Sequence, residues 1–155
     1  GMTDWGAHHF DIAQWGLNMD HSGPVEVYPP DGKEHKALTY RYANGVRLIY
    51  RTDAPYVRFE GTQGWLHAEY GKTLQAEPQS VLKAELGPRA VRFPFKSDKQ
   101  DFIDAVKSRG QTLEDAEVGH RTRSLCHLAH IAIQAGGEQQ DKNRVTHAWD
   151  CGWVW

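Results

Sequence analysis

The sequence predicts an α+β domain with a mainly antiparallel β-sheet and helices packed on one face. Three observations predict this fold class. Helical spacing runs through residues 4–15, short alternating strands joined by tight turns follow from residue 25 to residue 76, and two helical stretches follow from residue 97. Because strands joined by tight turns pair with their neighbours, the strands are expected to form an antiparallel meander that the helices cover on one side.

The first predicted helix places two stripes of side chains next to each other. Residues on one helical face recur at steps of three and four, and two sets within residues 4–16 satisfy that spacing. The sets are Trp5, His9, Ile12 and Gly16, and Asp4, His8, Asp11 and Trp15. The Ser22-Gly23-Pro24 sequence ends this region, and an extended segment is predicted at residues 25–28.

The strongest strand signal is a hairpin centred on Asn44-Gly45. Apolar and polar residues alternate on both sides of this dipeptide, with apolar positions at Leu38, Tyr40, Tyr42, Val46, Leu48 and Tyr50. Asn-Gly between alternating runs is typical of a type I′ turn, because both central residues of that turn need a positive φ. The sequence therefore predicts two strands joined by a type I′ turn.

A second strand pair is predicted at residues 57–60 and 65–70, with a further strand at 73–76. The turn between the paired strands reads Gly61-Thr-Gln-Gly64. The same GXXG spacing occurs in the loop with which KH domains hold nucleic acid. Because predicted strands flank the segment here, we interpret it as a turn.

Two helices are predicted in the C-terminal half. Ser97 followed by Gln100 indicates a capping box at the start of the first, which ends at Arg109-Gly110. Thr112 followed by Asp115 predicts a second box, which opens a long helix that ends at the next pair of glycines. The predicted apolar faces are Phe102, Ile103 and Val106, and then Val118, Leu125, Leu128, Ala129, Ala132 and Ile133.

Composition excludes several functional classes. The 155 residues carry 18 Lys and Arg against 20 Asp and Glu, a formal charge of −2 at pH 7, so we expect no nucleic-acid partner. No apolar run approaches the roughly 18 residues that span a membrane, so we expect no membrane partner. Cys126 and Cys151 are too few for a disulfide framework, which favours a cytoplasmic protein. Gly1 is interpreted as a tag remnant.

His8 is the main candidate for chemistry in the first helix. Asp4 precedes it by four residues and Asp11 follows it by three, so both carboxylates share its helical face. Such neighbours can orient an imidazole and favour its charged form, which prepares a general acid or base. Two other interpretations stay open: Asp4 caps the helix while the histidines pack, or Asp4 and His8 ligate a metal.

Three more histidines lie near one stripe of the long helix. His120 and His127 are seven residues apart, about 10 Å of helix rise, which is too far for one ion with ligands at about 2 Å. Only His127 and His130 could share a metal. A histidine-based metal protein is therefore a further, weaker alternative. We favour either the polar edge of an amphipathic helix or hydrogen-bonded core histidines, and we predict no metal. Cys126, between leucines, is predicted to be a buried small residue.

The predicted sheet is a candidate interaction surface. Its alternating positions carry aromatic residues on one side and a partly apolar set on the other: Tyr40, Tyr42, Tyr50 and Trp65, and Ile49, Leu66 and Ala68. Helices cover one face in this layout, so a partner subunit is expected on the other, although a polar face with scattered aromatics fits equally well. No G-x-G-x-x-G or P-loop occurs, so no cofactor is expected to bind this chain.

Several blocks in chain order carry a family resemblance. They read TDWGAHHFDI at 3–12, YANGV at 42–46, FEGTQGW at 59–65, DFIDA at 101–105, EVGHR at 117–121 and LCHL at 125–128. This order resembles the C-terminal domain of the Gfo/Idh/MocA oxidoreductases, the glucose-fructose oxidoreductase and inositol dehydrogenase family. We take residues 3–149 as that domain, clipped at its N-terminal side, and residues 141–155 as an atypical tail.

The resemblance implies a place for this domain in a larger enzyme. In that family an N-terminal Rossmann domain binds NAD or NADP, the first helix of the C-terminal domain faces the nicotinamide, and the sheet forms the oligomer interface. The family's D-x-x-x-H signature falls on Asp4 and His8, which implies that His8 is a substrate-contacting acid or base and Asp4 its partner. Trp5 and Asp11 are then expected to help bind the substrate. The implied reaction transfers hydride between a sugar or polyol and the nicotinamide.

The sequence also departs from the family's pattern. It contains neither the Rossmann half nor the Glu-Lys-Pro-type segment that supplies the family's catalytic lysine. We therefore expect a truncated substrate-binding and oligomerisation domain that is inactive alone, with a second copy, a Rossmann domain and a small sugar or polyol as its partners. The alternative is a free-standing binding or assembly module derived from that domain.

Overall fold

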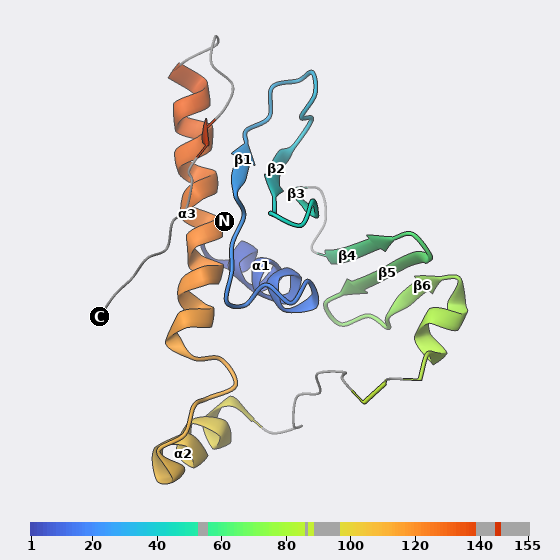
Figure 1. The fold of residues 1–155 in the computed structure, drawn as a ribbon, viewed down its shortest axis with the longest axis vertical. Coiled ribbons are helices and arrows are strands. Elements are labelled where there is room, and N and C mark those ends of the chain that lie inside the picture. Colours follow the sequence, from blue (N-terminus) through green and yellow to red (C-terminus); the bar gives the residue numbers. More distant parts are fainter. Residues whose placement is uncertain (53–55, 86, 89–96, 139–144, 147–155) are drawn as a thin grey trace. The chain divides into compact units, whose positions relative to one another are not determined.

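A computed structural model describes residues 1–52, 56–85, 87–88, 97–138 and 145–146 (Figure 1). The helices are α1 (Trp5–Gly16), α2 (Asp98–Ser108) and α3 (Ala116–Glu138), with a 3-10 helix η1 at Gln79–Lys83. The strands are β1 (Glu26–Tyr28), β2 (Leu38–Arg41), β3 (Arg47–Tyr50), β4 (Tyr56–Gly61), β5 (Gly64–Glu69), β6 (Gln75–Glu77) and β7 (Val145–Thr146). These elements confirm the predicted α+β class.

The strands pair antiparallel, as predicted, and they form two sheets. One sheet has the order β3-β2-β1-β7 and the other the order β4-β5-β6. The chain divides into two compact units, one formed by the described residues of Gly1–Ala54 and His120–Trp155, the other by those of Pro55–Gly119. Alternation along the chain predicts each hairpin, but the grouping of hairpins into sheets depends on longer-range pairing.

The core of the first unit lies between one face of its sheet and the helices α1 and α3. Val27 and Leu48 both lie opposite Tyr40 in neighbouring strands, so the three side chains project from the same face. The buried cluster consists of Phe10, Val27, Leu38, Tyr40, Tyr42, Leu125, Cys126, Leu128, Ala129 and Ala132. The prediction that helices cover one sheet face is confirmed for this unit, and so is the burial of Cys126.

Two buried tyrosines join the first sheet to the helices. The Tyr40 hydroxyl donates to the carbonyl oxygen of Leu125 at 2.7 Å, and the Tyr42 hydroxyl donates to Oε1 of Gln14. Burial raises the pKa of both hydroxyls far above the ordinary value for tyrosine. Both groups therefore stay protonated and keep donating at any pH near neutrality.

The turn at Asn44-Gly45 differs from the predicted type I′ turn. Gly45 has a φ of +87°, but Asn44 is not in the positive-φ region, which type I′ requires of both residues. The Gly45 N–H donates to the Tyr42 carbonyl at 2.9 Å, and the Tyr42 N–H donates to the Val46 carbonyl at 2.9 Å. This geometry is a three-residue loop with a glycine bulge. Asn-Gly fits both turns, and the strand register selects the longer one.

The start of α2 is capped by the predicted serine. Ser97 Oγ accepts a hydrogen bond from the Gln100 N–H at 3.1 Å. The Gln100 side chain donates to Asp104 at 2.7 Å and does not return to Ser97, so only half of the capping box forms. The helix ends at Ser108. Its C-cap residue, Arg109, has a φ of +56°, and the Gly110 N–H donates to the Ala105 carbonyl at 3.1 Å.

The residue predicted to cap α3 is wrong. Asp115, and not Thr112, caps the helix: its Oδ1 accepts from the N–H groups of Glu117 and Val118 at 2.9 and 3.1 Å. A carboxylate one residue before the helix reaches both N–H groups and also suits the positive end of the helix dipole. The helix continues through the predicted glycine pair to Glu138.

Two elements have no counterpart in the prediction, η1 and β7. β7 pairs with β1, with Glu26 opposite Thr146 and Val27 opposite Val145. A two-residue strand has no alternation to read, so only its pairing with a distant strand defines it. Cys151 and the rest of the predicted tail at 141–155 lie outside the described residues, apart from β7.

Candidate functional site

The candidate site is the exposed face of α1. The helix buries Gly6, Phe10, Ala13 and Gln14 against the core of the first unit. Neither predicted stripe contains any of these residues, so both stripes lie on the exposed and half-buried sides of the helix. Trp5 is 67% exposed, and Asp4 and His8 are exposed with it. The first two turns of α1 therefore present an aromatic ring, an imidazole and a carboxylate to solvent.

His8 lies beside an aromatic ring. The centroids of the Trp5 and His8 rings are 5.9 Å apart, with 58° between the ring planes. Within the described residues, neither a hydrogen bond nor an ion pair joins His8 to Asp4 or Asp11. Asp4 is the N-cap residue of α1 but makes no side-chain capping bond, which contradicts the capping alternative. Both ring nitrogens of His8 are thus available to exchange a proton with a bound molecule.

Asp11 is held by the long helix. The Thr122 hydroxyl of α3 donates to Asp11 Oδ1 at 2.9 Å, and the Asp11 side chain is half-buried. The structure therefore brings Trp5 and His8 together on one surface and places Asp11 at the contact between α1 and α3. Helical spacing predicts that Asp11 lies near His8, but nothing in the spacing identifies its bond to a residue 111 positions away.

Gln14 is a buried polar residue that the sequence analysis missed. Its Nε2 donates to the carbonyls of Met19 and Ser22 at 3.0 and 3.2 Å, and its Oε1 accepts from the Tyr42 hydroxyl. One side chain thus joins the end of α1 to the following loop and to Tyr42, the residue after β2. Glutamine is mostly found at protein surfaces, so the residue type gives no signal of this role.

Asp20 has a buried oxygen in the loop that follows α1. Its Oδ1 is inaccessible to solvent and has no hydrogen-bond partner among the described residues. Burial raises the pKa of Asp20 above its usual value, the nearby Asp11 carboxylate raises it further, and His21 opposes both effects. The charged form of Asp20 is therefore disfavoured in the folded chain.

Replacing Asp20 with asparagine is expected to stabilise the chain at neutral pH. Because the folded-state pKa of Asp20 is raised, its contribution to stability is fully present below the unfolded pKa of about 3.9 and is lost as the pH rises through the folded pKa. Urea unfolding of the wild type and of Asp20→Asn over a range of pH should show curves that separate as the pH increases. A constant separation at every pH would contradict this account.

The histidines of α3 belong to no cluster of metal ligands among the described residues. His120, His127 and His130 are all exposed, which fits the polar edge of an amphipathic helix. In the parts of the chain that the structure describes, no group of three or more His, Cys, Asp or Glu side chains is arranged to hold a metal ion. The absence of a bound metal stays a prediction.

The second unit carries a separate polar surface on its sheet. Side chains directly opposite each other across paired strands share a face, and the pairs on this face join Tyr56 to Glu69, Arg58 to His67 and Glu60 to Trp65. We call these six residues the β4–β5 polar face. The other face carries Val57, Phe59, Leu66, Ala68 and Ala76. Leu66 and Ala68 thus oppose the face that carries Trp65, as the alternation predicts.

The β4–β5 polar face is linked by side-chain contacts. The Arg58 guanidinium lies 4.3 Å above the Trp65 ring, and its Nε is 2.8 Å from Glu60 Oε1. The Tyr56 and His67 ring centroids are 4.6 Å apart.

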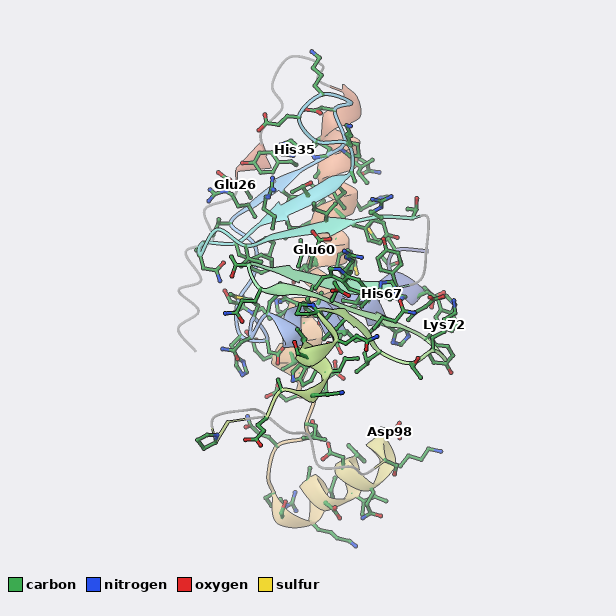
Figure 2. The ribbon with its side chains drawn as sticks, turned by 90° about the vertical axis from the view of Figure 1, so that its right-hand side faces the viewer. Glu26, His35, Glu60, His67, Lys72 and Asp98 are labelled. Carbon is green, nitrogen blue, oxygen red and sulfur yellow. The ribbon has the colours of Figure 1, made fainter. Side chains whose placement is uncertain are left out.

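The network continues beyond the strand. Lys72 Nζ lies 2.7 Å from Glu69 Oε1. Figure 2 labels Lys72 and also His67 and Glu60 of the β4–β5 polar face. Lys72 lowers the pKa of Glu69, with a smaller contribution from His67, whose Nε2 lies 3.9 Å from Glu69 Oε2. The β4–β5 polar face therefore carries aromatic rings next to side chains of both charges.

Comparisons with known proteins identify the family. A protein-family model described as the C-terminal alpha/beta domain of an oxidoreductase family, Gfo/Idh/MocA, matches residues 1–148. Searches of the curated proteins and of the solved structures find no significant match. Among the described residues, no helix is both long enough and apolar enough to cross a membrane. Since the match covers nearly the whole sequence, the chain belongs to the Gfo/Idh/MocA oxidoreductase family, as its C-terminal alpha/beta domain.

Proposed function

We propose that this chain is the substrate-binding and oligomerisation domain of an NAD(P)-dependent sugar or polyol oxidoreductase, and that it transfers no hydride alone. The observation that carries the proposal is the exposed pairing of Trp5 and His8 on α1, in a chain of this oxidoreductase family. An exposed tryptophan beside an exposed histidine offers a flat apolar surface next to a proton-exchanging group. A sugar or cyclitol ring presents the complementary C–H and hydroxyl groups.

Each residue of the α1 face has a proposed role. Trp5 packs against the C–H side of the substrate ring, and His8 exchanges a proton with the substrate hydroxyl. Asp4 lies one helical turn before His8 and orients the imidazole when the two side chains meet. Asp11 is half-buried and bonded to Thr122, so its expected contribution to substrate binding is through the position of the helix.

The hydride carrier is proposed to come from another domain. NAD(P), when bound, supplies the hydride acceptor at the substrate carbon. The sequence has no G-x-G-x-x-G loop, so we assign no residue of this chain to the dinucleotide. A Rossmann domain, on the same polypeptide or on a partner, would hold the nicotinamide against the α1 face. The low cysteine content is the ground for proposing that this occurs in the cytoplasm.

The β4–β5 polar face is the proposed contact with a second copy of the chain. Tyrosine, tryptophan and arginine dominate the energetics of protein interfaces, and Tyr56, Trp65 and Arg58 lie together there. The face also carries carboxylates beside its cations, so two copies related by a two-fold axis can match opposite charges.

Three measurements on the purified chain test the proposal. Calorimetry with NAD, NADP, NADH and NADPH is expected to show no binding, while light scattering shows a dimer or a larger oligomer. A sugar or cyclitol is expected to shift the NMR resonances of the Trp5 and His8 rings. Micromolar nucleotide binding would contradict the need for a Rossmann partner. An oligomer whose Trp5 and His8 resonances do not shift with any sugar would favour the alternative function, a free-standing assembly module.

Replacing Arg58 with glutamate is expected to weaken self-association by at least about tenfold. The change removes the contact with the Trp65 ring and places three acidic side chains together on the β4–β5 polar face. Sedimentation equilibrium of the variant and of the wild type measures the association constant. Lys107→Glu makes the same charge change on α2 and should leave association unchanged. Equal effects of the two variants would rule out this face as the interface.

A further inference from the structure

We propose that Thr122 and Arg123 of α3 are positioning residues for His8. Neither residue belongs to the exposed face of α1, and neither is part of the acid–base pair that the family signature places on Asp4 and His8. The inference rests on the proposed function in one respect, that His8 acts on the substrate. The imidazole is held in place by contacts that α1 makes within the first unit.

The N-terminal turn of α1 lacks two common sources of local stabilisation. Asp4 occupies the N-cap position without a side-chain bond, and the first turn contains no acidic residue. A side-chain capping bond and an acidic residue in the first turn normally stabilise the start of a helix. A helix of 12 residues is marginal in water by itself, so packing against other elements must set its position. The turn that carries Trp5 and His8 therefore depends on contacts from outside α1.

The long helix supplies these contacts on both sides of His8. Thr122 donates to Asp11 Oδ1 at 2.9 Å, one turn after His8. Arg123 Nη1 donates to the carbonyl of Thr3, before the helix begins. The Cys126 thiol lies 3.4 Å from the Met2 carbonyl and extends the second contact. Figure 1 shows α1 and the start of the chain beside α3.

Two separated anchors keep the first turns of a short helix wound. Gln14 holds the C-terminal end of α1, so the part that depends on further contacts is the N-terminal part that carries Trp5 and His8. Thr122 and Arg123 hold points before and after His8, so unwinding that separates the Trp5 and His8 rings breaks at least one of the two bonds. The Thr122 bond is also charge-assisted, because its acceptor is a carboxylate. A misplacement of about 1 Å at a reacting group can lower a rate about a hundredfold.

Thr122→Val removes the hydroxyl while keeping the shape of the side chain. The readout is the NMR shift of the His8 ring that arises from Trp5, defined by comparison with a Trp5→Leu variant. Thr122→Val is expected to reduce this Trp5-dependent shift, and Thr122→Ser is expected to keep it. Asp11→Ala should reduce the shift as much as Thr122→Val does. The double variant should show no further reduction, because both changes remove the same hydrogen bond. Ser124→Ala is the matched control, since within the described part of the chain its hydroxyl donates to the His120 carbonyl of the same helix and not to α1.

Arg123 is tested in the same way. Arg123→Ala is expected to reduce the Trp5-dependent shift of His8, and Arg123→Lys to recover part of it, because a lysine can also donate to the Thr3 carbonyl. Urea unfolding of each variant separates a change of position from a loss of the fold. The inference is overturned if Thr122→Val and Arg123→Ala, both folded, leave the His8 shift at its wild-type value, or if Ser124→Ala changes it equally.

These outcomes are independent of the test of the proposed function. The His8 shift is measured on the full chain without sugar or nucleotide. A chain that binds no sugar but shows the expected Thr122 effect would contradict the proposed function and retain the contacts that position His8. A chain that binds sugar through Trp5 and His8 but shows no Thr122 effect would support the proposed function and contradict the positioning role of Thr122.

Discussion

Replacing Gly64 with alanine is expected to lower the free energy of unfolding by about 3–5 kcal/mol. Gly64 begins β5 with a φ of +144°, a conformation that residues with a side chain rarely adopt. A Cβ atom there would lie 2.0 Å from the Glu77 carbonyl oxygen and 2.8 Å from Pro78 Cδ. Both neighbours belong to the backbone or to a proline ring, so neither can move aside without shifting β6.

Urea unfolding followed by circular dichroism measures this effect. Gly71→Ala is the matched control, because Gly71 has a φ of +73° but no atom within 4 Å of the added Cβ. It is expected to cost only the backbone strain, about 1 kcal/mol. The difference between the two variants then isolates the steric clash with β6. Equal losses for Gly64→Ala and Gly71→Ala would show that the clash contributes nothing.

Replacing Gln14 with leucine is expected to destabilise the chain by about 3–5 kcal/mol. Gln14 is fully buried, and its amide satisfies the carbonyls of Met19 and Ser22 and the hydroxyl of Tyr42. Leucine fills a similar volume but leaves these three groups without the partner they have now. A buried group that loses its partner costs its full desolvation free energy, about 1–3 kcal/mol.

Two further variants control for the loss at Gln14. Tyr42→Phe removes one of the three bonds and is expected to cost about 1–2 kcal/mol. In the double variant, the loss should be smaller than the sum of the two single losses, because the Tyr42 hydroxyl is no longer there to be left unpaired. Gln111→Leu, at an exposed position, should change stability by less than about 0.5 kcal/mol. A Gln14→Leu effect of that small size would contradict the proposed network.

Much of the secondary structure follows from local pattern. The alternation around Asn44-Gly45 predicts β2 and β3, and the Ser97 and Gln100 pair predicts the start of α2. The errors are local as well. Asn-Gly fits two turn types, and Thr112 and Asp115 are both residues that cap helices, so the sequence pattern does not choose between them.

The candidate site divides in the same way. Trp5 and His8 are three residues apart on a helix, so their proximity is a consequence of helical geometry and could be predicted. The role of His8 comes from the family signature and stays a proposal. The bonds of Gln14 to Tyr42 and of Asp11 to Thr122 could not be predicted, because the partners lie on different elements and no spacing rule connects them.

The sequence by itself determined the family, the α+β class and the position of the main helices and hairpins. These features depend on interactions between residues a few positions apart, which the order of side chains encodes directly. Only the tertiary structure decided how the strands divide into two sheets, which face of α1 is buried, and why Gly64 must lack a side chain. These features depend on packing and hydrogen bonding between distant segments, whose partners are chosen by the fold as a whole.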